Sequence, residues 1–146
     1  MRMNAAGLAI LKRFETCRLK AYPDVVGFSI GWGHHAPDIG ALTAWTQEQA
    51  DLALLSDIAE AERELASLLT TAVSDNAWSA LVDLVYNAGA GELKGSHTIE
   101  MVNAGRFAAA ADRLLLWDIV AGQPSVALRA RRAAERNLFL TPDTET

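Results

Sequence analysis

Apolar residues recur at helical spacing along most of the chain. Near its beginning, Asn4 is a suitable N-cap, and Leu8 and Leu11 follow at the spacing of one buried helix face. Thr46 and Gln49 form a capping-box pair before a second, longer run. The pattern predicts helices over approximately residues 5–15, 46–69, 75–88, 98–103, 107–120 and 125–140.

A segment rich in glycine and proline interrupts this helical pattern before residue 40. Within it, Phe28, Ile30 and Trp32 alternate with Ser29 and with glycines, which is the period of a β-strand. We expect the three apolar side chains to face a small core and Ser29 to face the other way. The segment therefore predicts a small β-rich part between the first helix and the remaining helices.

Length and composition are those of one compact globular unit. The chain has 146 residues, of which 51% are hydrophobic and 21% are charged. A single cysteine excludes an intramolecular disulfide. We expect one domain over residues 1–146, of the α+β class, with a β-rich part at about 16–40 beside a helical part at about 45–140.

Charge and hydropathy exclude several classes of partner. The net charge of −5 argues against a general nucleic-acid binder, which needs a basic surface. No apolar run approaches the ~18 residues of a membrane span. The short apolar run at residues 5–11 is followed at once by Lys12 and Arg13, so we interpret it as a helix rather than a signal peptide. The sequence therefore predicts a protein made in the cytoplasm without a recognisable signal peptide.

Two carboxyl groups, of Glu15 and Asp24, are the candidate catalytic groups. Glu15 ends a predicted helix, and Asp24 follows Pro23 in a turn, so the two lie in different settings. Cleavage of a glycosidic bond needs one carboxylic acid and one carboxylate, and a hydroxyl such as that of Ser29 can hold the attacking water. The same pattern also fits two solvated carboxylates with no catalytic role.

Metal and thiol chemistry have weak support. His34 and His35 are adjacent, but zinc needs three or four ligands in a defined geometry, so we expect no metal and no cofactor. We expect His34 to order the β-rich part through a hydrogen bond instead. Cys17 has no histidine at an informative spacing and is interpreted as a structural thiol.

Several separated motifs resemble one known family. They are Phe14-Glu15-x-x-Arg18-Leu19-x-Ala21-Tyr22-x-Asp24-x-x-Gly27, Ser29-Ile30-Gly31-Trp32-Gly33-His34, Tyr86-Asn87-Ala88-Gly89, Trp117, and Arg131-Arg132-Ala133-Ala134-Glu135. Their types and order resemble those of the phage-type lysozymes, the endolysins of glycoside hydrolase family 24. The resemblance covers about residues 7–140. It implies a muramidase that hydrolyses the β-1,4 bond between N-acetylmuramic acid and N-acetylglucosamine in peptidoglycan.

The resemblance also implies roles for particular residues. Glu15 would be the general acid, Asp24 the second carboxylate, and Ser29 would stand where the family usually has threonine. The family is regarded as inverting, which requires carboxyl groups about 6.5–9.5 Å apart. The residues implied as substrate-binding or site-supporting groups are His34, Asn87 and Arg131.

Alternatives remain open for two of these supporting residues. One arginine of the last helix is expected to reach Glu15, with Arg131 favoured slightly over Arg129, but the cluster could equally be a solvated face. Asn87 could bind sugar or the catalytic loop, or it could end its helix.

Ser29 and its loop depart from the family pattern. Ser29 lies five residues after Asp24, one fewer than is usual in the family, and it lacks the methyl group of threonine. A tighter loop at residues 25–27 could absorb the difference, or the hydroxyl could be displaced.

The function expected from these observations involves peptidoglycan and no nucleic acid. We expect a monomer that acts on the cell wall after release, with a holin as the partner that opens the membrane. One alternative is a weak or inactive descendant that binds peptidoglycan or a protein. Another is a lytic transglycosylase, a chemistry that usually relies on one carboxylate, so dependence on Asp24 would argue against it.

Overall fold

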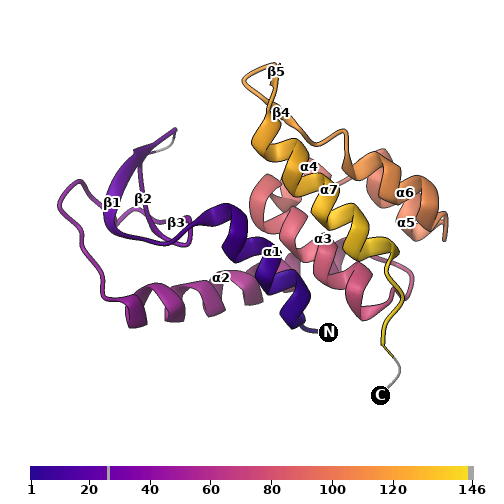
Figure 1. Cartoon of the computed structure of the whole chain (residues 1–146), viewed down its shortest axis with the longest axis horizontal. Helices are drawn as coiled ribbons and strands as arrows, with labels where there is room; N and C mark the ends of the chain where they lie inside the picture. Colours follow the sequence, from indigo (N-terminus) through magenta and orange to yellow (C-terminus); the bar gives the residue numbers. More distant parts are fainter. Residues whose placement is uncertain (26, 145–146) are drawn as a thin grey trace.

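The computed structural model describes residues 1–25 and 27–144. Figure 1 shows a small sheet lobe on one side and a body of helices on the other, with the longest helix extending from the sheet to the body. The elements in chain order are α1 (Ala5–Glu15), β1 (Arg18–Asp24), β2 (Gly27–Gly31), β3 (His34–His35), α2 (Gln47–Leu68), α3 (Asp75–Ala88), α4 (Ala90–Leu93), α5 (His97–Asn103), α6 (Phe107–Leu114), β4 (Ile119–Val120), β5 (Gln123–Pro124) and α7 (Val126–Leu140). The expected α+β class is confirmed.

Polar side chains cap the starts of α1, α2, α3, α5 and α7, close to where the sequence predicts them. Asn4 Oδ1 accepts a hydrogen bond from the backbone N–H of Gly7 at 3.0 Å. Thr46 and Gln49 form the reciprocal bonds of a capping box at the start of α2. The further serine caps are Ser74, Ser96 and Ser125.

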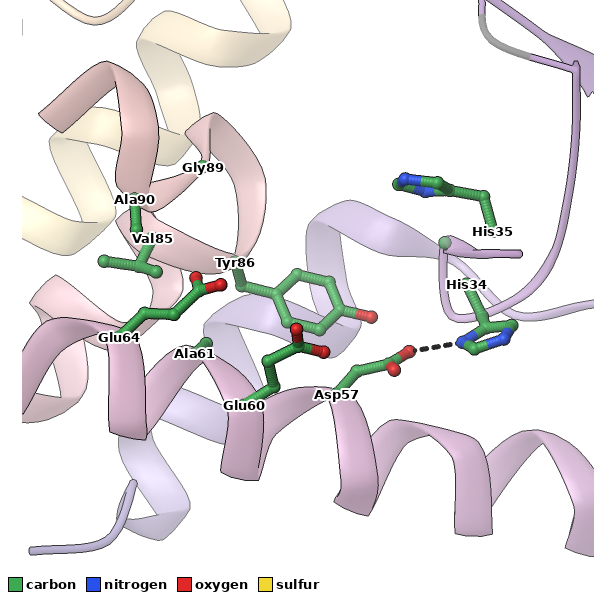
Figure 2. Close-up of a pocket in the computed structure, with 11 residues that line it drawn as sticks. His34, His35, Asp57, Glu60, Ala61, Glu64, Val85, Tyr86, Gly89 and Ala90 are labelled. Carbon is green, nitrogen blue, oxygen red and sulfur yellow. Dashed lines mark hydrogen bonds and ion pairs between the residues drawn. The ribbon is translucent and has the colours of Figure 1, made fainter. Parts of the chain in front are cut away.

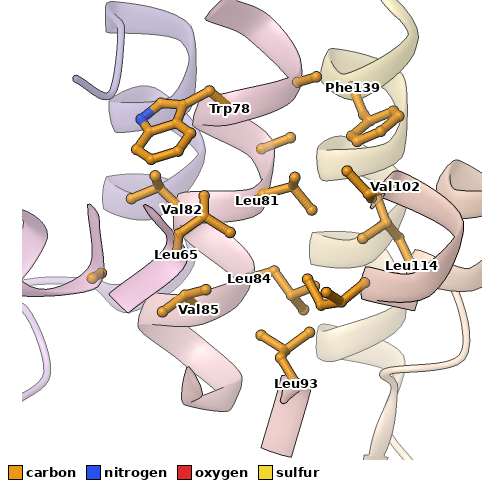
Figure 3. Packing of buried hydrophobic residues seen from close by; sticks show 14 of the residues in the cluster. Leu65, Trp78, Leu81, Val82, Leu84, Val85, Leu93, Val102, Leu114 and Phe139 are labelled. Atoms are coloured by element: carbon orange, nitrogen blue, oxygen red, sulfur yellow. The ribbon is translucent and has the colours of Figure 1, made fainter. Parts of the chain in front are cut away.

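Helix α3 is the centre of the helical body. It packs against α1, α2 and α7, and every residue from Ala77 to Val85 is buried. Figure 3 shows its apolar side chains meeting those of the surrounding helices. Fully burying one leucine contributes about 1.5–3 kcal/mol, so this cluster supplies most of the hydrophobic stabilisation. The members of this cluster that Figure 3 labels are Leu65, Trp78, Leu81, Val82, Leu84, Val85, Leu93, Val102, Leu114 and Phe139.

The sheet lobe is an antiparallel meander in the order β1-β2-β3. Tyr22 pairs with Ser29 and Asp24 pairs with Gly27, so the β1–β2 connection is a tight hairpin. Val26, in the loop expected to absorb the shortened spacing, lies outside the described residues. The sheet is attached to α1 at one end and rests on α2.

Burial along β2 differs from the expected alternation. Ile30 is fully buried, as predicted, but Phe28 and Trp32 stay partly exposed. Ser29, on the other face, is only 1% exposed. Ser29 lies opposite Tyr22 on the hairpin and donates its hydroxyl to Asp24, so this polar side chain is buried with a hydrogen-bond partner.

The segment after α6 also corrects the sequence prediction. The helix expected over 107–120 ends at Leu114, and β4 and β5 form a short hairpin. Ala121 and Gly122 turn the chain with φ values of 49° and 79°. The run of apolar residues continues past Leu114 at helical spacing, so periodicity alone did not reveal the end of the helix. The short helix α4 was not predicted either.

No helix within residues 1–25 and 27–144 has both the length and the apolar character needed to cross a bilayer.

Candidate active site

Glu15 lies where the helical body meets the sheet lobe. It is the last residue of α1, and Thr16 turns the chain toward the sheet with φ of 50°. Its side chain is 17% exposed. Gly33 presses against it, because a Cβ at this position, where φ is +87°, would lie 2.6 Å from Glu15 Oε2. Only glycine fits both this backbone conformation and this contact.

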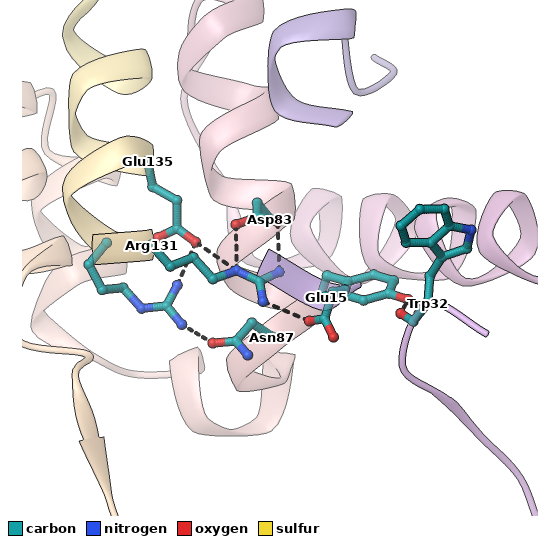
Figure 4. A network of polar contacts seen from close by, with 8 residues as sticks. Glu15, Trp32, Asp83, Asn87, Arg131 and Glu135 are labelled. Atoms are coloured by element: carbon teal, nitrogen blue, oxygen red, sulfur yellow. Dashed lines mark hydrogen bonds and ion pairs between the residues drawn. The ribbon is translucent and has the colours of Figure 1, made fainter. Parts of the chain in front are cut away.

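Arg131 holds the other oxygen of Glu15. Its Nη1 donates to Glu15 Oε1 at 2.7 Å, and its Nε and Nη2 each donate to the carboxylate of Asp83 at 2.9 Å (Figure 4). Arg131 is 3% exposed and Asp83 is completely buried. Burial lowers the pKa of Arg131, but the hydrogen bonds and charges of Asp83 and Glu15 outweigh burial and raise that pKa above its ordinary value.

The structure therefore decides between the two arginines. Arg131 reaches Glu15, whereas Arg129 is exposed and pairs with Asp118 at 3.1 Å. Arg131 is fixed by α3 as well as by its own helix, so its guanidinium has a defined position. This rigid support is what a site needs to hold a reacting carboxyl in one orientation.

A second buried arginine extends the network to Asn87. Arg132 donates to Glu135 Oε1 at 2.5 Å, to the backbone carbonyl of Trp117 at 2.8 Å, and to Asn87 Oδ1. Asn87 therefore joins α3 to α7, and Gly89, not Asn87, is the C-cap of α3. Contact between Asn87 and substrate stays a prediction.

Glu135 is a buried carboxyl beside another carboxyl. Burial raises its pKa well above the ordinary value, and a hydrogen bond with Asp83 raises it further, although Arg132 opposes both effects. Within the described part of the chain, the buried Oε2 of Glu135 has no hydrogen-bond partner.

Asp24 and Ser29 meet on the hairpin of the sheet lobe. The hydroxyl of Ser29 donates to Asp24 Oδ2, and Asp24 is exposed to solvent at the end of β1. The shortened spacing has therefore not separated the two side chains. Tyr22, opposite Ser29, lies near both candidate carboxyl groups: burial, then the charge of Glu15, then that of Asp24, raise its pKa.

A cavity of about 410 Å³ opens between the sheet lobe and the helices (Figure 2). His34 Nδ1 is 2.8 Å from Asp57 Oδ2, and the imidazole packs on Trp45 with the ring centroids 5.3 Å apart. The expected ordering role of His34 fits this contact, which ties the sheet to α2. The cavity-lining residues are Gly33, His34, His35, Asp57, Glu60, Ala61, Glu64, Val85, Tyr86, Gly89 and Ala90.

Sequence reasoning missed three polar groups that support this region. Asp83 interrupts the apolar face of α3, and a carboxylate in that position is a signal for a buried partner. Tyr86 donates its hydroxyl to the backbone carbonyl of Trp32 at 2.6 Å, joining α3 to the sheet. Asp57 holds His34, but nothing local in α2 distinguishes it from a solvated residue.

Metal ligation has no geometric support in the region that the structure describes. There, no three side chains of His, Cys, Asp or Glu converge in a way that could hold an ion.

A small sheet beside a helical body, with a carboxyl held at their junction, defines a lysozyme-like fold. The family model described as phage lysozyme matches residues 12–135. The chain therefore belongs to the phage lysozyme family, a class of glycoside hydrolases.

Known relatives agree with this assignment. The endolysin of Salmonella phage P22 is 35% identical over 146 residues, which cover 97% of this chain and 99% of that protein. The endolysin of Bacillus phage B103 is also 35% identical, but this chain spans only 56% of its length. Among solved structures, the muramidase domain of SpmX from Asticaccaulis excentricus superposes with a TM-score of 0.88 at 32% identity, covering 97% of this chain and 99% of that one.

Proposed function

We propose that this protein is a muramidase that hydrolyses the β-1,4 bond between N-acetylmuramic acid and N-acetylglucosamine in bacterial peptidoglycan. One observation carries the proposal: Glu15, at the end of α1, is held by Arg131 at 2.7 Å, and Asp24, on the hairpin of the sheet lobe, accepts the hydroxyl of Ser29. One carboxyl is partly buried and hydrogen-bonded to an arginine, and the other is solvent-exposed. Membership of the phage lysozyme family supports the same chemistry.

In the proposed reaction, Glu15 donates its proton to the glycosidic oxygen as the bond from that oxygen to the anomeric carbon breaks. A water bound by Asp24 and Ser29 attacks the anomeric carbon from the opposite face and gives its proton to Asp24. The result is one free reducing end and inversion at that carbon. Arg131, 2.7 Å from Glu15, stabilises the carboxylate that remains after proton transfer.

The proposed substrate, peptidoglycan, also indicates where the protein acts. We propose that the protein acts as a monomer, folds as one domain, and reaches the wall after synthesis in the cytoplasm. A partner of the holin type would open the membrane. The proposed supporting residues are His34, which binds Asp57 of α2, Asn87, which accepts a hydrogen bond from Arg132 of α7, and Arg131, which holds Glu15.

The decisive experiment compares the wild-type protein with Glu15→Gln in a turbidity assay on outer-membrane-permeabilised Gram-negative cells. We expect lysis by wild type and a loss of at least about 100-fold in Glu15→Gln, because an amide cannot donate the proton. Glu100→Gln is the matched control: its exposed side chain pairs with His97 on α5, a helix that Figure 1 shows on the side of the helical body away from the sheet lobe, so lysis should be unchanged.

Product analysis separates the remaining alternatives. Free reducing ends, together with loss of activity in Asp24→Asn, support the hydrolase. Anhydro ends and activity without Asp24 would mean a lytic transglycosylase. No lysis by a correctly folded wild-type protein that still binds isolated walls would point to the binding descendant.

A further inference from the structure

Four charged side chains are buried together beside Glu15, where α7 packs on α3. Asp83 and Glu135 are completely buried, and Arg132 and Arg131 are 1% and 3% exposed. A charge that is removed from water needs a partner of opposite sign, so the positive and negative charges of such a cluster should balance.

The carboxyl groups of this cluster outnumber its guanidiniums by one. Arg131 binds Glu15 at 2.7 Å and Asp83 at 2.9 Å, and Arg132 binds Glu135 at 2.5 Å. Both guanidiniums are always charged. The cluster is therefore neutral when one of its three carboxyl groups is protonated, and it carries a net negative charge when none is.

One guanidinium connects the first and the last of these carboxyl groups. Arg131 Nη1 lies 2.7 Å from Glu15 Oε1, and its Nε lies 3.9 Å from Glu135 Oε1 (Figure 4). The two carboxyl groups are thus within about 10 Å of each other, where unit charges shift each other's titration by roughly one pH unit at an effective dielectric constant near 20. Asp83 accepts hydrogen bonds from both Nε and Nη2 of Arg131, the fork geometry of an ionised carboxylate. The extra proton is therefore left to Glu15 and Glu135.

Glu135 is a buried carboxyl that the proposed reaction does not otherwise use. Its Oε1 contacts both arginines, but within the described residues its Oε2 is buried without a hydrogen-bond partner. Burial raises the pKa of Glu135, although the charge of Arg132 opposes this effect. Glu135 therefore competes with Glu15 for the extra proton, and the two titrate as a pair.

The other ionisable groups near this pair come from the surrounding elements. Burial raises the pKa of Tyr22 on β1 and of Tyr86 on α3, so these two phenols near Glu15 keep their protons. The charged groups on the remaining elements are the same in the wild type and in Glu135→Gln. They are Lys12 and Arg13 of α1, Asp57, Glu60 and Glu64 of α2, Asp112 of α6, and Arg136 of α7.

We propose that Glu135 is a positioning residue for hydrolysis that acts through Arg131: it shares one proton with Glu15, and its carboxylate keeps the acid form of Glu15 populated. When Glu135 is ionised, the two guanidiniums are already balanced by Glu135 and Asp83. Loss of the proton from Glu15 to solvent then leaves a net negative charge in the cluster, which opposes that loss. The inference rests on the proposed muramidase function, in which Glu15 is the acid.

The test is the pH dependence of kcat in Glu135→Gln. Glutamine keeps an oxygen that can accept from Arg132 but removes the negative charge. The alkaline limb of the profile should move to lower pH by roughly one unit, so the variant is about ten-fold slower on that limb. At lower pH, where Glu15 is protonated in both proteins, kcat should be the same. Asp112→Asn is the matched control: it removes a carboxylate that also pairs with an arginine of α7, but one that is 66% exposed, so its limb should stay in place.

A second measurement does not depend on activity. NMR of isotope-labelled glutamate follows the side-chain carboxyl carbons of Glu15 and Glu135, each assigned by the signal that its glutamine variant loses. In the wild type, both carbons should titrate in two steps. Glu135→Gln should move the midpoint of Glu15 to lower pH, and Glu15→Gln should move that of Glu135 by the same amount, because such coupling is reciprocal.

Three results would overturn the inference while leaving the muramidase function standing. They are an unmoved alkaline limb in Glu135→Gln, an equal loss of kcat at every pH, and independent one-step titrations of the two carbons. If thermal unfolding shows that Glu135→Gln does not fold, the titrations of the wild type and Glu15→Gln decide. A wild type without hydrolysis but with coupled titrations would overturn the function and retain only the shared proton.

Discussion

Removal of Asp83 tests whether the buried ion pair beneath Glu15 holds the structure together. In Asp83→Ala, Arg131 loses two hydrogen bonds of 2.9 Å while its guanidinium stays buried. Deleting one partner of a buried pair costs about 3–5 kcal/mol, because the remaining charge is left without compensation.

Two neighbouring carboxyl groups place the expected cost in stability at the lower end of that range. Glu15 still accepts from Arg131 at 2.7 Å, and Glu135 Oε1 lies 3.9 Å from Arg131 Nε, where it can ionise once Asp83 is gone. We therefore expect a loss of ~3 kcal/mol in the free energy of unfolding. For a chain of this size that corresponds to a fall of about 6–12 °C in Tm.

Urea unfolding followed by circular dichroism measures this loss, with Asp112→Ala as the matched control. Asp112 also pairs with an arginine of α7, Arg136, at 2.8 Å, but Asp112 is exposed and Arg136 is only partly buried. Its removal should cost less than about 1 kcal/mol. Equal small losses in both variants would refute the argument that burial makes the Asp83 pair structurally important.

Three further outcomes follow from single contacts. Gly33→Ala should lower kcat at least about ten-fold, because the new Cβ would lie 2.6 Å from Glu15 Oε2, and steady-state kinetics measures it. Thr46→Ala removes the capping box of α2 and should cost about 1 kcal/mol in a urea titration. Glu135→Gln should flatten the decline in stability above about pH 4.5, since its amide can donate to Asp83 without ionising.

The sign of the last effect follows from proton counting. The pKa of Glu135 is higher in the folded state than in the unfolded chain. Above the unfolded pKa, near 4.5, the folded protein therefore binds more protons, and stability falls as pH rises toward the folded pKa. Parallel stability curves for wild type and Glu135→Gln across this window would contradict the assignment. An unchanged kcat in Gly33→Ala would contradict the predicted contact with Glu15. An unchanged urea midpoint in Thr46→Ala would contradict the predicted contribution of the capping box.

Helix starts and the strand hairpin were predictable because their causes are local. Asn4 and Thr46 accept hydrogen bonds from backbone groups three residues away, so the signal is contained in adjacent sequence. The alternation around Ile30 likewise indicated a strand. The proposed pair Asp24 and Ser29 could be nominated for the same reason, since five residues and one hairpin connect them.

The end of α6, the burial of Ser29 and the support of Glu15 were decided by tertiary structure. Arg131 and Glu15 are 116 residues apart, and Arg131 and Asp83 are 48 apart. No local propensity selects Arg131 over Arg129; the packing of α7 on α3 buries one guanidinium beside two carboxylates and leaves the other exposed. Charges in a packed interior must be paired, and their partners come from whichever elements the core brings into contact.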